Sequence, residues 1–168
     1  MNSKRWLAAY VKMHHEKRVY DRLTGMNIEC FLPIQREVRK WSDRKKKVDK
    51  ILIPMMIFVR ISQQEHLEVL QTSSVLQFLT LRNEKKPAVI PDEQMERFRF
   101  IVDNSEEDIA IHNGADLTVG KTVRVIKGPL TGLIGELAQL EGKNKIAINI
   151  PQLGYASVEI KKSFVEVL

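Results

Sequence analysis

The sequence predicts an α+β fold in two parts: an N-terminal split βαβ unit and a small all-β barrel. In the first hundred residues, segments with strand and helix periodicity follow one another in the order β-α-β-β-α-β. Beyond an acidic stretch, Ile and Val alternate with polar residues between glycine-containing turns. The 168 residues are 43% hydrophobic, which is enough to fold one globular domain or two small ones.

The N-terminal part is predicted to form a four-stranded antiparallel sheet with helices. Its expected strands cover residues 6–11, 28–32, 50–53 with 55–61, and 75–81. A first helix is expected over 15–26, with Val19, Leu23 and Met26 at helical spacing, and a second over 63–71, with Leu67 and Leu70 facing inward. A third helix follows Pro91, on an apolar stripe of Met95, Phe98, Ile101 and Val102.

Domain boundaries follow from composition. Residues 1–103 form the first domain, residues 104–115 are acidic and are predicted to be a linker, and residues 116–168 form the second domain. Because the linker offers little apolar surface, the two domains are expected to tumble independently. A helical form of the last segment is the alternative, but Pro151, Gly154 and the Ile/Val alternation favour strands.

Positive charge is concentrated in the first domain. The chain has a net charge of +6, and residues 1–103 hold 20 basic and 13 acidic residues against seven and five in residues 116–168. The block 34–52 is the densest part and is predicted to be a mobile basic hairpin suited to a polyanion, or alternatively a solvated loop. His14, Arg18 and Arg22 are spaced at i, i+4 and i+8, which predicts a cationic row on the first helix, suited to binding a polyanion or alternatively only a solvated face.

The sequence lacks the motifs of an enzyme or a metal protein. The four histidines have no ligand spacing, and the glycine-rich stretch 128–135 lacks the residues of a P-loop or a dinucleotide turn, so its glycines are expected in tight barrel turns. Cys30 is expected to be a buried thiol and not a nucleophile. No signal peptide or membrane span is apparent near the N-terminus, and the expected location is the cytoplasm. We therefore expect no catalytic residue, cofactor or metal.

Two sets of residues resemble one known family across nearly the whole chain. The first set comprises residues 6–10, Phe31-Leu32-Pro33, Pro54 with Phe58-Val59, and Pro91-Asp92-Glu93; the second comprises Gly120, Val123, Val125, Gly128-Pro129, Gly132 and Gly135. The first resembles the N-terminal (NGN) domain of NusG transcription elongation factors, and the second resembles their SH3-like KOW barrel. The short length and the lysine-rich hairpin are most similar to the specialised RfaH- and UpxY-like antiterminators.

This resemblance implies a role for particular residues. An apolar surface that binds RNA polymerase would contain Tyr10, Ile53, Met56 and Phe58, with the consecutive methionines suited to an adaptable contact. The alternative is that these residues belong to the core of the sheet. The non-template DNA strand would meet Lys12, His14, Arg18 and Arg22, and upstream duplex DNA would meet Arg44, Lys45, Lys46 and Lys47. The KOW turn would be formed by Gly128, Pro129, Leu130, Gly132 and Gly135. Two positions depart from the family pattern: Pro54-Met55-Met56 replaces Pro-Gly-Tyr, and Leu130 replaces Phe.

The implied function is that of a transcription elongation and antitermination factor, a monomer with RNA polymerase and DNA as partners. A ribosomal protein or a termination factor would be the partner of the KOW domain, and no membrane is involved. The alternative is a ribosome-associated or RNA-binding KOW protein. Such a protein should be basic across the barrel, whereas here the positive charge lies in the first domain, which favours the transcription factor.

Overall fold

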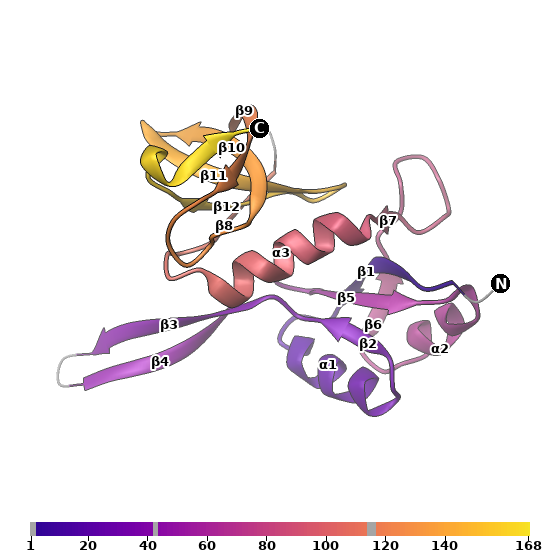
Figure 1. Cartoon of the computed structure of the whole chain (residues 1–168). Helices are drawn as coiled ribbons and strands as arrows, with labels where there is room; N and C mark the ends of the chain where they lie inside the picture. Colours follow the sequence, from indigo (N-terminus) through magenta and orange to yellow (C-terminus); the bar gives the residue numbers. More distant parts are fainter. Residues whose placement is uncertain (1–2, 42–43, 114–116) are drawn as a thin grey trace. The chain divides into compact units, whose positions relative to one another are not determined.

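A computed structural model describes residues 3–41, 44–113 and 117–168, with only the backbone described for 37–41 and 44–47. Its helices and strands are drawn in Figure 1. Contacts within the chain divide it into two units. Unit 1 consists of Met1–Pro33 and Ile53–Asp92, and unit 2 consists of Ile34–Leu52 and Glu93–Leu168.

Unit 1 is built on an antiparallel sheet with the strand order β2-β5-β1-β6, in which β7 also pairs with β1. Its strands are β1 (Arg5–Val11), β2 (Glu29–Phe31), β5 (Met56–Ile61), β6 (Val75–Phe78) and β7 (Val89–Ile90). Its helical elements are α1 (Glu16–Gly25), the 3-10 turn η1 (Gln63–Glu65) and α2 (His66–Leu70). Strands expected over 6–11, 28–32, 55–61 and 75–81 are in this sheet, and β7 is an additional one. The expected segment 50–53 is not, because Lys50 and Ile51 end β4, which pairs with β3.

Because side chains alternate across a strand, the sheet of unit 1 has two distinct faces. Leu7, Ala9 and Val11 of β1 form one face together with Ile57, Val59 and Ile61 of β5. Val19 and Leu23 of α1 and Val69 of α2 pack into the same cluster. Both helices therefore cover this face (Figure 1).

The second helix differs from its prediction. The segment 63–71 begins as a 3-10 turn and has only five α-helical residues, so the inward face is set by Val69, which is fully buried. Leu67 and Leu70 are 63% and 39% exposed, so the prediction that they face inward was wrong. In so short a helix the apolar spacing does not determine which residue meets the sheet.

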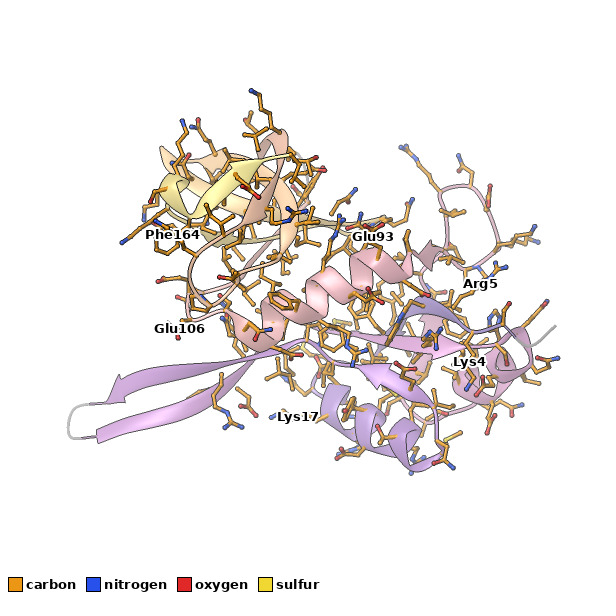
Figure 2. All side chains as sticks on the ribbon, viewed as in Figure 1. Lys4, Arg5, Lys17, Glu93, Glu106 and Phe164 are labelled. Atoms are coloured by element: carbon orange, nitrogen blue, oxygen red, sulfur yellow. The ribbon has the colours of Figure 1, made fainter. Side chains whose placement is uncertain are left out.

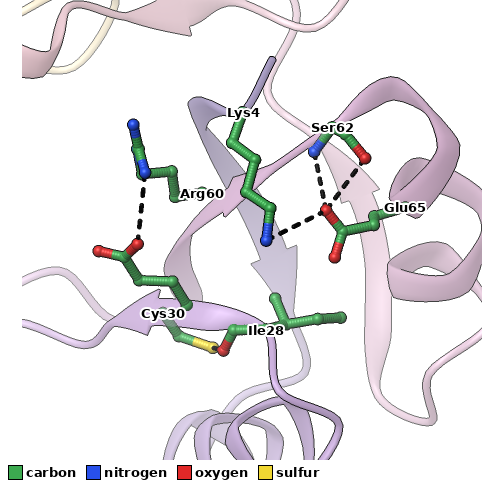
Figure 3. A network of polar contacts seen from close by, with 7 residues as sticks. Lys4, Ile28, Cys30, Arg60, Ser62 and Glu65 are labelled. Carbon is green, nitrogen blue, oxygen red and sulfur yellow. Dashed lines mark hydrogen bonds and ion pairs between the residues drawn. The ribbon is translucent and has the colours of Figure 1, made fainter. Parts of the chain in front are cut away.

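A polar network lies at the C-terminal end of β5, near β2 and η1 (Figure 3). Arg60 forms ion pairs with Glu29 at 3.6 Å and with Asp92 at 3.9 Å. The Ser62 backbone N–H donates to Glu65 Oε1 at 3.0 Å. This hydrogen bond is the main reason why the pKa of Glu65 lies below its usual value. Lys4 lies 3.8 Å from the same oxygen.

Unit 2 contains a two-stranded ribbon, a helix and a six-stranded sheet. The ribbon pairs β3 (Ile34–Trp41) with β4 (Arg44–Ile51), and the helix is α3 (Asp92–Asn104), whose Met95, Phe98 and Ile101 are fully buried. The sheet has the order β13-β9-β10-β11-β12-β8. Its strands are β8 (Ala110–His112), β9 (Thr118–Val125), β10 (Ile134–Leu140), β11 (Lys143–Ile150), β12 (Gly154–Glu159) and β13 (Val165–Val167), and the 3-10 turn η2 (Lys162–Phe164) precedes the last.

Two features of unit 2 bear on the sequence analysis. Residues 116–168 form strands in the described part of the chain, as the Ile/Val alternation indicated. Strand β8, in contrast, lies inside residues 104–115 and pairs with β12. The acidic composition of that segment gave no sign of this strand. Among the helices described, none is long and apolar enough to cross a membrane.

Candidate functional site

The register between β1 and β5 brings three of the four apolar candidate residues together. Tyr10 is paired with Met56, and Ala8 is paired with Phe58. The residues of these two pairs lie on the sheet face opposite to the one that α1 and α2 cover. Phe31 of β2 is paired with Phe58, with the two ring centroids 6.2 Å apart. Ile53 lies in the segment between β4 and β5. One face of the sheet thus carries an aromatic and methionine cluster.

These candidate residues are exposed to different degrees. Tyr10 and Ile53 are half-buried, whereas Met56 is 3% exposed and Phe58 is fully buried. The expectation that Met56 lies on the surface was therefore wrong for this structure. Consecutive methionines did not indicate exposure, because a residue within a central strand is covered on both faces of the sheet. Of the four candidate residues, Tyr10 and Ile53 are the more accessible.

The residues before Met56 form a fixed loop. Met55 has a φ of 63°, which is in the left-handed region that favours glycine. Its N–H donates to Glu16 Oε2 at 2.9 Å, and its carbonyl accepts from the Val11 N–H at 2.9 Å. Glu16 is 3% exposed and lies in the first turn of α1, where a carboxylate also interacts favourably with the helix dipole. This explains why the family pattern has glycine where this chain has Met55.

A second fixed loop carries two of the cationic candidates. The Lys12 N–H donates to the Ser74 carbonyl at 3.0 Å, and His15 Nδ1 forms a hydrogen bond of 2.7 Å with Ser74 Oγ. The turn closes on itself, since the His15 N–H donates to the Lys12 carbonyl. Lys12 and His14 are exposed, so this turn presents them to solvent beside the β6 end of the sheet.

The predicted cationic row is only partly present. Arg18 and Arg22 lie one turn apart on α1 and are both exposed, as the spacing indicated. His14 was expected to extend this row, but α1 begins at Glu16 and His14 has a φ of 65°, so it lies outside the helix. The reason is that residues 12–15 form a turn between β1 and α1, which Ser74 holds through Lys12 and His15.

The basic block forms the paired ribbon expected from the sequence. Its backbone register places Lys40 opposite Lys45 and Arg39 opposite Lys46. Arg44, Lys45, Lys46 and Lys47 belong to β4, but their side chains lie outside the described part of the structure. Nearer the base, Arg36 pairs with Asp49 at 3.5 Å and its side chain is 68% exposed.

The glycine-rich segment forms turns between β9 and β10. Gly128 and Gly132 have φ angles of 89° and 95°, and the Thr131 hydroxyl donates to the Gly128 carbonyl at 2.6 Å. Gly135 has a different role, since a Cβ there would lie within 3 Å of Ile146, Ala147 and Ile148. Leu130 is 6% exposed, while Pro129 is exposed. The prediction of tight turns is confirmed for Gly128 and Gly132.

The remaining reactive group is inert. Burial raises the pKa of Cys30 to about 11, and its thiol donates to the Ile28 carbonyl at 3.2 Å (Figure 3). It is therefore protonated at neutral pH and is a poor nucleophile. Within residues 3–41, 44–113 and 117–168, no group of three or more His, Cys, Asp or Glu residues is placed to hold a metal ion.

Sequence reasoning missed Glu16 and Ser74, which hold the two loops of the candidate site. Both are single polar residues whose partners lie 39 and 59 positions away along the chain. No local spacing marks such a contact. For Glu16 the sequence indicates only an acidic residue in the first turn of a helix, which does not identify Met55 as its partner.

A family model and one solved structure agree with this architecture. The family model for NusG, described as transcription termination factor nusG, matches residues 4–99. A structure solved for domain interaction in Thermotoga maritima NusG has a TM-score of 0.50 at 18% identity, covering 98% of this chain and 97% of that one. The MjSpt4:Spt5 complex in conformation A gives a TM-score of 0.32 at 12% identity, with 97% of each chain covered. No curated protein matches. The family model covers more than half of the chain, and the chain therefore belongs to the NusG family.

Proposed function

We propose that this protein is a transcription elongation and antitermination factor that binds RNA polymerase through its N-terminal domain, residues 1–103. It resembles the RfaH- and UpxY-like members of the family, so its targets would be particular operons such as capsule or polysaccharide loci. No bond is made or broken, because the factor acts by binding and disfavouring the paused state. Residues 116–168 would form the KOW domain, which would contact a ribosomal protein or a termination factor.

The observation that carries this proposal is the accessibility of Tyr10 and Ile53 beside the fixed Met55 loop, with the buried Met56 and Phe58 supporting Tyr10 on the same sheet face. A partner that lays a helical tip against such a surface gains from burying exposed aromatic and aliphatic side chains. Tyr10 and Ile53 are accessible, and the adjacent Met55 loop is held by Glu16. A contact surface with fixed edges loses less conformational entropy on binding.

The cationic residues are assigned to DNA. Lys12, His14, Arg18 and Arg22 are all exposed on the turn and helix that follow β1. Arginine binds phosphate through a forked pair of donors and also stacks on unpaired bases, which suits the single non-template strand. The lysines of β4, Lys45 to Lys47, would contact upstream duplex DNA through its phosphates without reading its sequence.

The test is an elongation assay with purified core RNA polymerase on several leader templates. The parent protein is expected to shorten pauses or read through terminators on some templates. Arg18→Ala and Arg22→Ala should lose activity on those templates selectively, whereas neutralising Lys45, Lys46 and Lys47 together should weaken DNA association uniformly and reduce its salt dependence. A parent protein that neither binds polymerase nor changes elongation would contradict the proposed function.

A further inference from the structure

Unit 1 contains a pocket of about 590 Å³ that lies apart from the candidate site described above. Its floor includes Leu7 of β1 and Ile61 of β5, which are both buried. These two residues belong to the sheet face that α1 and α2 cover, so the pocket lies on the face opposite to Tyr10. Pockets that hold small molecules have volumes of about 300–1,000 Å³, and this one lies within that range.

The loop between β6 and β7 forms one wall of this pocket, and backbone pairing fixes the base of the loop. The Ala88 N–H donates to the Leu79 carbonyl at 2.8 Å. One residue earlier, Pro87 forms an isolated bridge with Thr80. Lys86 directly precedes this paired base, and both Lys86 and Pro87 line the pocket. The fold therefore holds this wall in place beside the sheet.

The charged side chains that line the pocket are all basic. Arg5, which is labelled in Figure 2, and Lys86 are exposed, and His66 of α2 is half-buried. Among the described residues no Asp or Glu lines the pocket, and neither Arg5 nor Lys86 forms an ion pair. Burial holds the pKa of His66 below its usual value, so at pH 7 its imidazole is mainly neutral and can donate or accept a hydrogen bond. Two cations without a partner favour an anionic ligand.

Apolar and neutral polar groups lie beside these cations. Leu81, Pro87 and Val89 line the pocket, and Val89 is 43% exposed, so its side chain is available to a ligand. Ser3 adds a hydroxyl group and Gln63 adds an amide. A small inorganic anion would leave this apolar surface and most of the volume unused. The lining instead fits an anion joined to a flat, largely apolar body with polar edges, which is the chemistry of a nucleoside phosphate.

We propose that this pocket binds a nucleoside phosphate, with the phosphate held by Arg5 and Lys86 and the base packed against Leu81 and Val89. The forked donors of an arginine match two phosphate oxygens, while a lysine contributes a point charge. The amide of Gln63 supplies a donor and an acceptor for the polar edge of the base. A free nucleotide and one nucleotide of a single strand share this chemistry, and the test below distinguishes them. The site is separate from the proposed polymerase surface.

The experiment is an NMR titration of the full-length protein with adenosine monophosphate, adenosine and inorganic phosphate as separate probes. Adenosine monophosphate should shift the signals of His66, Lys86 and Val89 until they saturate, while those of Tyr10 stay unchanged. Adenosine and inorganic phosphate should each bind about tenfold more weakly or less, because each lacks one half of the recognised group. A short adenylate oligonucleotide is the fourth probe. Tighter binding of the oligonucleotide at the same signals assigns the pocket to a single strand, and weaker binding assigns it to the free nucleotide.

Two matched variants test whether the pocket, and not the overall charge of the loop, binds the phosphate. Lys86→Met removes a positive charge and keeps an apolar side chain, and Lys85→Met makes the same change at an exposed neighbour that is not among the lining residues. Lys86→Met and Arg5→Gln should each weaken the binding of adenosine monophosphate by about tenfold or more, since each removes a charge-assisted hydrogen bond. Lys85→Met should bind like the parent, and circular dichroism should show that all variants are folded.

Three results would overturn the proposal. The first is that adenosine monophosphate at millimolar concentration causes no saturable shift at these signals. The second is an equal loss of binding in Lys86→Met and Lys85→Met, which would show only general attraction to a basic loop. The third is that adenosine or inorganic phosphate binds as tightly as adenosine monophosphate. If Arg5→Gln does not fold, the two lysine variants decide the outcome alone. None of these measurements involves polymerase, so failure here and failure of the proposed function are distinguishable.

Discussion

Removing the buried carboxylate of Glu16 should destabilise unit 1 and loosen the loop beside the candidate polymerase surface. Glu16 Oε2 accepts the Met55 N–H at 2.9 Å, and the side chain is 3% exposed. A hydrogen bond to a charged group contributes about 1.5–3 kcal/mol, and an acidic residue in the first turn of a helix adds about 0.3–1 kcal/mol. We therefore expect Glu16→Ala to lower the free energy of unfolding by about 2–4 kcal/mol.

The assay is thermal and denaturant unfolding of the full-length protein, followed by far-UV circular dichroism. In a domain of this size, 1 kcal/mol changes the melting temperature by about 4–8 °C, so the expected loss is about 10 °C or more. Glu16→Gln keeps an acceptor oxygen without the charge and should show an intermediate loss. Glu84→Ala removes an exposed carboxylate from the same unit and should change the free energy of unfolding by less than about 0.5 kcal/mol.

The reasoning would be refuted if Glu16→Ala unfolds like the parent. That result would mean that the Met55 N–H finds water or another acceptor at no cost. A loss of stability with unchanged polymerase binding would separate the two claims, because it would show that the Met55 loop supports the fold without shaping the contact surface.

Three further predictions concern stability and reactivity. Met55→Gly should raise the free energy of unfolding by about 0.5–1 kcal/mol, since glycine adopts the left-handed φ of 63° without strain; a lower melting temperature would contradict this. Gly135→Ala should destabilise the C-terminal sheet by about 1–3 kcal/mol, because the added Cβ would lie 2.8 Å from Ile146 Cγ1, and unchanged denaturant unfolding would disprove it. Burial raises the pKa of Cys30 from 9.0 to about 11, so the folded state favours the protonated thiol. The free energy of unfolding should therefore fall as the pH rises from about 9 to 11. Alkylation of Cys30 at about pH 8 should be slower in the folded protein than in denaturant, and equal rates would contradict this.

The main strands of the first domain and their order along the chain could be predicted because their apolar patterns are visible in the sequence. Residues 6–11 and 55–61 are nearly continuous apolar runs, as expected of central strands that are covered on both faces. The order of elements then limits the topology, since a split βαβ unit has few alternatives. The position of the basic block as a ribbon between strands could also be predicted, because it lies between the apolar segments 28–32 and 55–61.

The site could be predicted only where local spacing determines it. Arg18 and Arg22 were found because i and i+4 residues of a helix share a face. The burial of Met56, the position of His14 outside the helix and the exposure of Leu67 depend on contacts distant in sequence, which a pattern does not contain. Strand β8 is three residues long and could not be recognised, because the strand it pairs with lies more than 40 residues later.

The most direct test of the account is the equilibrium affinity of the full-length protein for core RNA polymerase, measured with the parent, Tyr10→Ala and Lys143→Ala. Tyr10 is half-buried on the proposed contact face, so its truncation should weaken binding by about tenfold or more while circular dichroism shows a folded protein. Lys143, on β11 with an exposed side chain 3.9 Å from Glu159, should bind like the parent when replaced. Equal affinity of all three proteins would contradict the assignment of this sheet face to polymerase.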